Sequence, residues 1–306
     1  MTTYWITGGT GLIGRHLVQR FLKERQSMVV LSRSAGKHFA PESSNNLVAI
    51  DFDLAKDDFL SLPEPKDDVV LFALSSKITT SFDLKEIESV LNCDTIGHLR
   101  LIESLKPQLR QIVYTSSATV YGWPDELPAT EESPLNPENV YALNKTAMEM
   151  FLQQVRKKYS LPVSVIRISQ VYGPGADKRA AMYRFLSLAH KNESPIITGS
   201  PDTIRDYCHV LDVVDAILLA LKNRVDDNLN IGSGDPVSIK ELAKICINCA
   251  NSDKEPIEQD GAQESNKTSR WLDISKAKKL IKYNPKMRVR MGVKSEYERI
   301  YQPSYK

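Results

Sequence analysis

Tyr141 and Lys145 are the residues whose types and spacing most directly suggest chemistry, since they stand four positions apart in the run Y-A-L-N-K. The run Tyr141 to Val155 has the pattern of a helix, and positions i and i+4 of a helix lie on one face. A tyrosine holds its proton to a pH of about 10, but a nearby fixed cation favours the phenolate. The pair is therefore a candidate acid/base group, although Y-x-x-x-K alone is also typical of a half-buried Tyr beside a solvated Lys.

A glycine-rich turn stands near the N-terminus, where T-G-G-T-G-L-I-G occupies residues 7–14. The apolar run 4–7 before it predicts a strand, and the run 15–24 after it predicts a helix. The spacing fits G-x-G-x-x-G from Gly9 and also G-x-x-G-x-x-G from Gly8. Such a turn lets the backbone approach a pyrophosphate that faces the helix N-terminus. We therefore expect a dinucleotide site that includes Gly8, Gly11, Leu12, Ile13 and Gly14.

The second predicted strand, residues 28–31, ends in Ser32-Arg33-Ser34. NAD-binding versions of this fold place an acidic residue near this point to hold the ribose hydroxyls, whereas an Arg suits the 2′-phosphate of NADP. Position 32 is Ser, Arg33 follows it, and Lys37 offers a second positive charge. The sequence thus favours NADP. The alternative is that Arg33 stacks on the adenine and that the protein accepts NAD as well.

Composition narrows the class of protein. The chain has 306 residues, 42% of them hydrophobic, which is ample for a core. A formal net charge of +2 creates no global field for nucleic acid. No window approaches 18 consecutive apolar residues, so we expect no membrane insertion and a cytoplasmic protein.

The four cysteines, at positions 93, 208, 246 and 249, include the pair C-I-N-C. A second pair or nearby histidines would be needed for a zinc site, and neither accompanies it in the sequence. The segment 239–250 has helical periodicity, so both sulfurs are expected to pack against a core. We expect no metal site and a thiol-reducing compartment.

Further strand-like runs occur at 47–50, 69–73, 111–115 and 163–168, separated by helical or loop segments. This alternation predicts an α/β fold with a doubly wound parallel sheet, the Rossmann arrangement, in which ligands bind beyond the carboxyl ends of the strands. Small or polar residues follow these ends. Asp53 and Leu54 come after the third strand, Ala73 ends the fourth, and Ser116 and Ser117 follow the fifth.

Several further motifs accompany these features. They are Asn92, Y-T-S-S-A-T-V-Y-G at 114–122, V-Y-G-P-G at 171–175, R-D-Y-C-H-V at 205–210, N-I-G-S-G at 230–234 and D-I-S-K-A-K at 273–278. With them, the chain resembles the extended short-chain dehydrogenases/reductases of the NAD-dependent epimerase/dehydratase family, which act on nucleotide sugars. The resemblance runs nearly from end to end.

The resemblance implies roles for named residues. Ser117 would hydrogen-bond the reacting oxygen, Tyr141 would transfer the proton, and Lys145 would bind the nicotinamide ribose and lower the pKa of the tyrosine. The reaction implied is hydride exchange between a sugar carbon, most often carbon 4, and the cofactor. Asp53 and Leu54 would hold the adenine, and Ala73 would line the cofactor path.

Substrate contacts follow from the same resemblance. Arg205 would clamp the diphosphate of the sugar nucleotide. Gln170 stands where most members have Asn, so its amide is one methylene longer. Arg270 lies in the region of the family's Arg-x-Gly-Asp element, which is missing, and would substitute for that arginine.

Dehydratases of the family carry Asp-Glu after the serine or threonine, and decarboxylases carry a Glu, but this chain has Ala118 and Thr119 there. Neither side chain can act as a general acid or base. Two enzyme classes then stay open: a 4-epimerase, favoured by the S-A-T-V-Y string, and an NADPH-dependent 4-keto sugar reductase, favoured by the expected NADP preference. A non-catalytic NADP-binding regulatory protein is the third reading.

The expected architecture has two parts. Residues 1–171 with about 206–234 would form the dinucleotide-binding domain, and about 172–205 with 235–306 a smaller substrate-binding lobe, with the substrate between them. The family's habit of pairing through two long helices, here near 87–105 and 142–159, predicts a homodimer.

Overall fold

The computed structural model describes residues 2–39, 45–74, 79, 81–259 and 269–302. The chain divides into two compact units. Unit 1 comprises 1–122, 134–167 and 214–229, and unit 2 comprises 123–133, 168–213 and 230–306. The division by task expected from the sequence, cofactor in one part and substrate in the other, stays a prediction. The boundaries between the two compact units lie at other residues than those of the two expected domains, and residues 206–213 belong to unit 2.

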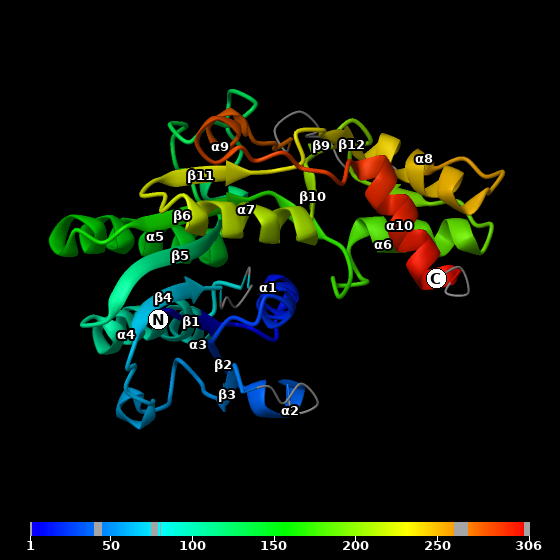
Figure 1. The fold of residues 1–306 in the computed structure, drawn as a ribbon. Helices are drawn as coiled ribbons and strands as arrows, with labels where there is room; N and C mark the ends of the chain where they lie inside the picture. Colours follow the sequence, from blue (N-terminus) through cyan, green and yellow to red (C-terminus); the bar gives the residue numbers. More distant parts are fainter. Residues whose placement is uncertain (1, 40–44, 75–78, 80, 260–268, 303–306) are drawn as a thin grey trace. The chain divides into compact units, whose positions relative to one another are not determined.

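A seven-stranded sheet in the order β11-β6-β5-β4-β1-β2-β3 confirms the doubly wound fold (Figure 1). Its strands are β1 (Thr2–Thr7), β2 (Met28–Ser32), β3 (Leu47–Asp51), β4 (Asp68–Ala73), β5 (Leu109–Ser117), β6 (Val163–Ile168) and β11 (Asn228–Ile231). β1 pairs in parallel with both β2 and β4, and the order of the strands reverses at this point. Thr7 and Ala73 are partners there. In open α/β sheets this switch point is where ligands bind, beyond the carboxyl ends of the strands.

Helices connect these strands. They are α1 (Leu12–Lys23), α2 (Ala35–Phe39), α3 (Leu84–Val90), the π-helix η3 (Leu91–Ile96), α4 (Gly97–Leu105), α5 (Val140–Tyr159) and α7 (Val210–Lys222), with short 3-10 turns η2 (Phe59–Ser61) and η4 (Ala118–Tyr121). The single long helix expected near 87–105 is therefore three segments. Asp94 and Thr95 of this π-helix are buried. Single π turns often occur at functional sites.

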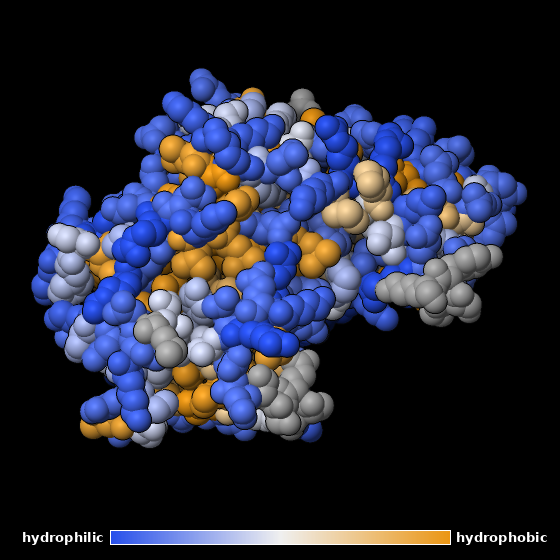
Figure 2. Space-filling view, in the orientation of Figure 1, coloured by the Kyte–Doolittle hydropathy of each residue, from blue (hydrophilic) through white to orange (hydrophobic). Residues whose placement is uncertain are grey.

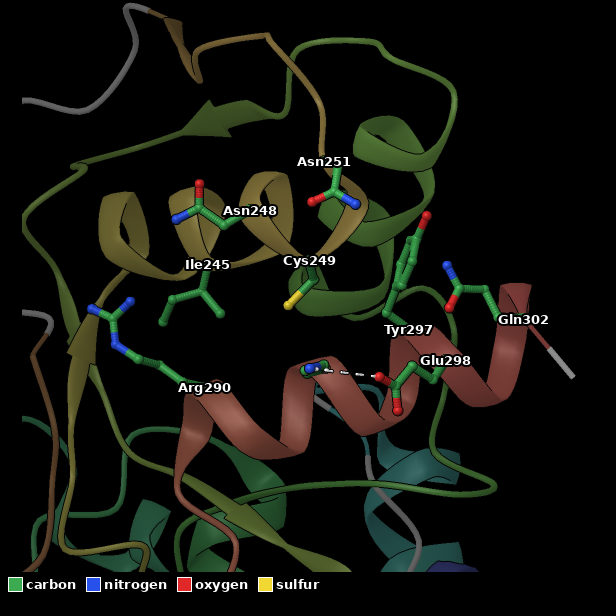
Figure 3. Close-up of a pocket in the computed structure, with 9 residues that line it drawn as sticks. Ile245, Asn248, Cys249, Asn251, Arg290, Tyr297, Glu298 and Gln302 are labelled. Carbon is green, nitrogen blue, oxygen red and sulfur yellow. Dashed lines mark ion pairs between the residues drawn. The ribbon is translucent and has the colours of Figure 1, made fainter. Parts of the chain in front are cut away.

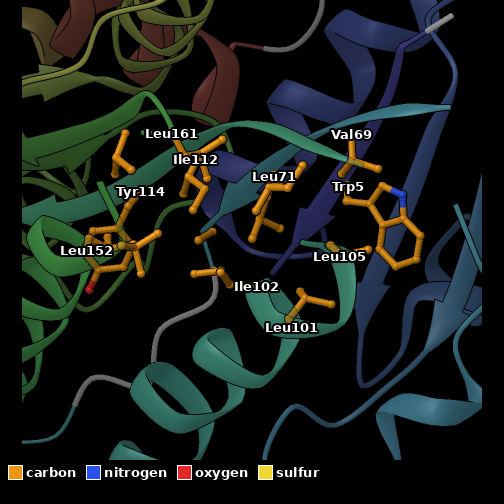
Figure 4. Close-up of a cluster of buried hydrophobic side chains, with 14 of the residues drawn as sticks. Trp5, Val69, Leu71, Leu101, Ile102, Leu105, Ile112, Tyr114, Leu152 and Leu161 are labelled. Atoms are coloured by element: carbon orange, nitrogen blue, oxygen red, sulfur yellow. The ribbon is translucent and has the colours of Figure 1, made fainter. Parts of the chain in front are cut away.

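Alternate residues of the strands face the two sides of the sheet, since the side-chain period of a strand is two. On one side, Leu71 of β4 lies in a buried cluster with Leu101 of α4 and Leu152 of α5 (Figure 4). On the other side, the ring of Phe72 lies 5.5 Å from that of Phe21 in α1. Both faces are thus covered by helices, which explains why the central strands read as nearly continuous apolar runs.

Unit 2 combines short strands with helices. The strands pair as β7 (Gln170–Tyr172) with β10 (Tyr207–His209), β9 (Ile204–Arg205) with β12 (Val237–Ser238), and β8 (Ile196–Thr198) with β13 (Ile257–Gln259). The helices are α6 (Ala181–His190), α8 (Ile239–Ala250), α9 (Ser275–Ile281) and α10 (Val289–Tyr301). A second buried cluster, with Leu186, Leu242 and Val293, joins α6, α8 and α10.

Hydrophilic side chains cover most of the face drawn in Figure 2. In the described part of the chain, no helix has the length and apolar content that crossing a membrane requires.

Candidate active site

The glycine turn joins β1 to α1 as the sequence predicts. Gly8 has φ of 64°, a left-handed conformation that favours glycine, and its carbonyl oxygen accepts a hydrogen bond from Gly11 N at 2.9 Å. A Cβ at Gly14 would lie 2.2 Å from Gly8 O, so α1 can pack against the turn only because residue 14 lacks a side chain. Leu12 and Ile13 form the first turn of α1, which contains no acidic residue.

This geometry fits a dinucleotide. The open amides at the start of α1 and the positive end of the helix dipole attract a pyrophosphate, and the absent side chains leave room for its approach. The turn is also fixed to β2, because Gly8 N donates to Leu31 O at 3.0 Å and Thr10 Oγ1 donates to Ser32 Oγ at 3.3 Å.

The residues expected at the adenosine ribose lie at the end of β2. Ser32 is half-buried, whereas Arg33, Ser34 and Lys37 are exposed, the last of these on α2. A carboxylate to which the sequence analysis assigns no role lies nearby. Asp51, the register partner of Ser32, accepts a hydrogen bond from Gly36 N at 2.8 Å.

Asp53 and Leu54 follow the carboxyl end of β3, and Ala73 is the last residue of β4. Asp53 Oδ1 accepts a hydrogen bond from Ala55 N at 3.0 Å, which shapes the turn after β3. Leu54 is buried, and Gly97 of α4 packs directly against it, since a Cβ there would lie 2.7 Å from Leu54 Cβ. Ala73 is fully buried at the end of β4.

Tyr141 and Lys145 stand on α5, which begins where the side chain of Asn139 accepts a hydrogen bond from Ala142 N at 2.9 Å. Lys145 is buried, and its Nζ donates to Thr115 O of β5 at 2.9 Å. The same Nζ lies 4.7 Å from the ring centre of Tyr114 and 5.8 Å from that of Tyr141. The cation predicted to act on Tyr141 is thus held beside it by a backbone oxygen of the strand that carries Ser117.

Burial lowers the pKa of Lys145, and the charges of Asp94 and Glu149 oppose this shift. Burial disfavours the ammonium, while nearby carboxylates favour it. The charge of Lys145 is therefore stabilised by one carboxylate of its own helix, Glu149, and by one of η3, Asp94.

Ser117 is the last residue of β5, and its hydroxyl begins η4. Its Oγ accepts hydrogen bonds from Thr119 N at 3.2 Å and from Thr119 Oγ1 at 3.0 Å. A serine hydroxyl has two acceptor positions and one proton to donate. Because Thr119 uses both acceptor positions, the proton of Ser117 is directed to a further acceptor, as a group that donates to a substrate oxygen requires.

Glu149 lies one helical turn beyond Lys145 and is a buried group that the sequence reasoning missed. Arg167 Nη2 donates to Glu149 Oε2 at 2.7 Å, and the hydroxyl of Ser116 donates to Glu149 Oε1. Arg167 also donates to the hydroxyl of Tyr121 at 2.8 Å. Burial disfavours the Arg167 cation, but the hydrogen bonds and charge of Glu149 raise its pKa overall. Position i+8 from Tyr141 was the available signal, because it continues the same face of α5.

A second buried network lies under Lys145. Thr95 Oγ1 donates to Asn144 Oδ1 at 2.7 Å, and Asn144 Nδ2 donates to Asp94 Oδ2 at 3.3 Å. His98 lies 2.5 Å from Asp94 O through Nδ1 and 2.8 Å from Thr7 Oγ1 through Nε2. Burial lowers the pKa of His98 to about 4, and Lys145 adds to this shift, so the ring is neutral at pH 7. Nδ1 must then donate to Asp94 O, and Nε2 accepts from Thr7.

The expected substrate residues all lie in unit 2. Gln170 is exposed on β7, and its backbone N donates to Asp206 O at 3.0 Å. Arg205 and Arg270 are half-buried and are brought together by a parallel β-bridge. Their guanidinium carbons lie 5.5 and 4.7 Å from the ring centre of Trp123. Trp123 carried no sequence signal, because its partners are far along the chain.

A separate pocket of about 350 Å³ lies between α8 and α10 (Figure 3). Its charged side chains are engaged by others, with Arg290 2.8 Å from Glu241 and Lys294 3.9 Å from Glu298. It contains none of the predicted site residues, so its volume does not make it the candidate site. Within the described ranges, no group of three or more His, Cys, Asp or Glu side chains is placed to hold a metal.

Comparisons with known proteins agree with these features. A sequence model of the NAD dependent epimerase/dehydratase family matches residues 4–232. A UDP-glucose 4-epimerase of Mycolicibacterium smegmatis is 29% identical over 306 residues, covering 96% of each chain. A dTDP-D-glucose 4,6-dehydratase of Homo sapiens is 28% identical over 253 residues, covering 79% of this chain and 72% of that protein. The crystal structure of a UDP-glucose 4-epimerase from Thermotoga maritima with UDP-glucose aligns with a TM-score of 0.84 at 25% identity, over 99% of each chain.

Proposed function

Since the chain belongs to the NAD dependent epimerase/dehydratase family, we propose that it is a nucleotide-sugar 4-epimerase. The observation that carries the proposal is the contact of Lys145 with Thr115, which fixes the helix of Tyr141 against the strand of Ser117. Similarity to UDP-glucose 4-epimerases over almost the whole chain supports the same reaction and favours a UDP-hexose as substrate.

In this proposal the bound nicotinamide cofactor supplies a hydride acceptor and, in the return step, a hydride donor. Tyr141 takes the proton of the hydroxyl on carbon 4 as the ketone forms and gives it back as the ketone is reduced. Ser117 donates a hydrogen bond to the same oxygen, and the charge of Lys145 stabilises the phenolate of Tyr141. The three residues therefore serve both directions of one reaction.

Dehydration is not part of the proposal. The two residues after Ser117 are a buried alanine, Ala118, and Thr119, whose hydroxyl already donates to Ser117. Elimination of water needs an acid and a base near the sugar, and neither side chain can transfer a proton at neutral pH. This separates the chain from the dehydratases that it also resembles.

For the cofactor, we propose NADP in preference to NAD, although the family is named for NAD. Arg33 and Lys37 provide two exposed cations at the end of β2 and on α2, and the residue after Leu31 is Ser rather than an acid. Two cations suit a 2′-phosphate. Asp51 favours NAD, because a carboxylate near this position suits free ribose hydroxyls. One of its two oxygens, Oδ1, already accepts a hydrogen bond from Gly36 N.

For the substrate, Arg205 and Arg270 would bind the diphosphate, and Gln170 would contribute its amide. Guanidinium groups match phosphate oxygens in geometry and charge. These assignments rest on the resemblance and on the proximity of the two arginines.

We propose further that two copies associate through α5 and the η3 segment. Large apolar side chains are exposed on both, namely Leu143, Met150 and Phe151 on α5 and Leu91 and Ile96 on η3. Exposed apolar side chains gathered on neighbouring helices mark protein interfaces. The four free cysteines fit a thiol-reducing, cytoplasmic setting.

The test is incubation with UDP-, dTDP-, GDP- and CDP-hexoses and a catalytic amount of NADP or NAD, followed by mass and proton spectra. An isomer of unchanged mass, formed without net cofactor consumption, is expected. Turnover only with a 4-keto sugar and a full equivalent of NADPH would instead indicate the reductase, and a product lighter by one water would refute the proposal. NADP binding without turnover of any of these sugars would instead support a non-catalytic, NADP-binding regulatory protein.

A further inference from the structure

Trp123 lies beside two cations at once. The guanidinium carbon of Arg205 lies 5.5 Å from the centre of its ring, and that of Arg270 lies 4.7 Å from it. Both distances fall within the range of a cation–π contact, for which tryptophan is the best partner among the aromatic residues. The two guanidinium groups can therefore be no farther apart than these two distances combined.

The backbone brings the two arginines together as well. Residues 205 and 270 are partners in a parallel β-bridge, and Arg270 N donates to Ile204 O at 3.1 Å. Two positive charges placed side by side repel each other, and like charges at paired strand positions destabilise a fold. The backbone nevertheless keeps the two guanidinium groups close together, and guanidinium groups match phosphate oxygens in geometry and charge.

The segment that carries Trp123 is fixed to the segment that carries Arg270. Ala129 N donates to Trp271 O at 3.0 Å, and Asp273 N donates to Ala129 O at 2.8 Å. All of these residues belong to unit 2. Two backbone hydrogen bonds at Ala129 thus tie the stretch that follows Trp123 to the stretch that follows Arg270.

We propose that Trp123 is a positioning residue that holds Arg205 and Arg270 together as a preformed, doubly charged site for the diphosphate of a nucleoside diphosphate sugar. This inference rests on the proposed function and adds to it the residue that organises the two arginines. The negative face of the indole ring attracts both guanidinium groups and so holds them close to each other. A diphosphate ester, with one negative charge on each phosphate, matches the two cations, whereas a monophosphate or a neutral sugar does not.

The first experiment is calorimetric titration of the whole protein with UDP, UMP and uridine. Wild-type protein is expected to bind UDP best. Trp123→Leu should weaken UDP binding about tenfold or more, and Trp123→Phe, which keeps an aromatic face, by only about threefold. Trp271→Phe is the matched control, because it alters the neighbouring indole and retains the backbone bond to Ala129; UDP binding should change less than about twofold.

Circular dichroism checks the fold of each variant, and Trp123→Phe keeps the test valid if Trp123→Leu unfolds. Equal binding by wild type and both Trp123 variants would overturn the inference.

The second experiment shows whether Trp123 acts through the arginines. In a protein with Arg205→Met and Arg270→Met, the further change Trp123→Leu should cost no additional UDP affinity, since coupled residues are not additive. The same tenfold loss in that background would mean that the indole contacts the ligand itself, and would overturn the inference. In turnover assays, Trp123→Leu should raise KM and leave kcat nearly unchanged, because the diphosphate is bound alike in the ground and transition states.

These results are distinguishable from a failure of the proposed function, since UDP titration needs no turnover. UDP binding that depends on Trp123 in a protein without epimerase activity would retain this inference and refute only the function. The inference about Trp123 would be overturned by an active epimerase whose UDP affinity does not change when Trp123 is replaced. A wild-type protein that binds none of UDP, dTDP, GDP and CDP would overturn it as well.

Discussion

Lys145 Nζ donates a hydrogen bond to the carbonyl oxygen of Thr115 at 2.9 Å. Through this contact, a buried cation of α5 meets the backbone of β5 two residues before Ser117. The next residue of the strand, Ser116, donates to Glu149, one turn farther along the same helix. The strand and the helix that carry the proposed catalytic groups are therefore joined at successive positions.

Tyr141→Phe should lower turnover about 10²-fold or more, because it removes only the oxygen that transfers the proton. The fold and the affinity for NADP should be retained. The matched control is Tyr159→Phe at the other end of α5, which should keep wild-type rates. Steady-state rates and cofactor titration of both variants give the answer, and near-normal turnover by the Tyr141 variant would show that the pair has been misread.

Glu149→Gln should reduce the free energy of unfolding by about 3 kcal/mol or more, since it leaves the buried guanidinium of Arg167 without its carboxylate. The control is Glu103→Gln, which removes an exposed ion pair with Lys106 and should leave the free energy of unfolding nearly unchanged. Urea denaturation measures both. A Glu149 variant as stable as the Glu103 variant would contradict the structural role given to this carboxylate.

Arg33→Ala should weaken NADP binding by roughly 1.5–3 kcal/mol and leave NAD binding almost unchanged, because only NADP offers a 2′-phosphate to the guanidinium. Lys23→Ala, in the last turn of α1, is the control for a general loss of positive charge. Both cofactors are titrated against the three proteins. Equal losses for the two cofactors, or tighter NAD binding by wild type, would refute the NADP assignment.

His98 should make stability depend on pH. Its pKa is about 4 in the folded protein and 6.5 when unperturbed, so as pH falls below 6.5 the unfolded chain gains a proton that the folded chain does not. Stability is therefore lost progressively from pH 6.5 to about 4, by up to about 3 kcal/mol, and is unaffected by this group above pH 6.5. Thermal unfolding of wild type, His98→Gln and the exposed control His38→Gln checks this. Only the His98 variant should show the shallower acid slope, and parallel curves for all three would contradict the prediction.

Much of unit 1 can be predicted from the sequence because its signals are local. Gly8 follows an apolar strand and Gly14 lies in the first turn of α1, and the structure shows that Gly8 has a positive φ and that Gly14 has no room for a Cβ. The sequence predicts a helix from residue 15, whereas α1 begins three residues earlier, at Leu12. The N-cap residue is Gly11, which has no polar side chain to mark this start. Long-range features are harder to predict. The meeting of Trp123 with Arg205 and Arg270 depends on contacts across more than 80 residues, as the numbering shows.

The π turn at 91–96 has a similar cause. The sequence predicts one long helix there, since its apolar spacing suits either form. The wider turn is followed by contacts with distant parts of the chain, of Gly97 with Leu54 and of His98 with Thr7, which the sequence does not show. The sequence also predicts that the chain returns to the sheet within 206–234, but it does not locate β11, whose four residues are too few for a periodic signal. Glu149, by contrast, could have been found from the face of α5.

The most direct test of the account uses UDP-glucose that carries deuterium on carbon 4, with a catalytic amount of cofactor. An epimerase that returns the hydride to the carbon it left should give a 4-epimer of unchanged mass with the deuterium still on carbon 4. Product in which the deuterium has been replaced by hydrogen, or turnover that stops when one equivalent of cofactor is consumed, would contradict hydride return at this site.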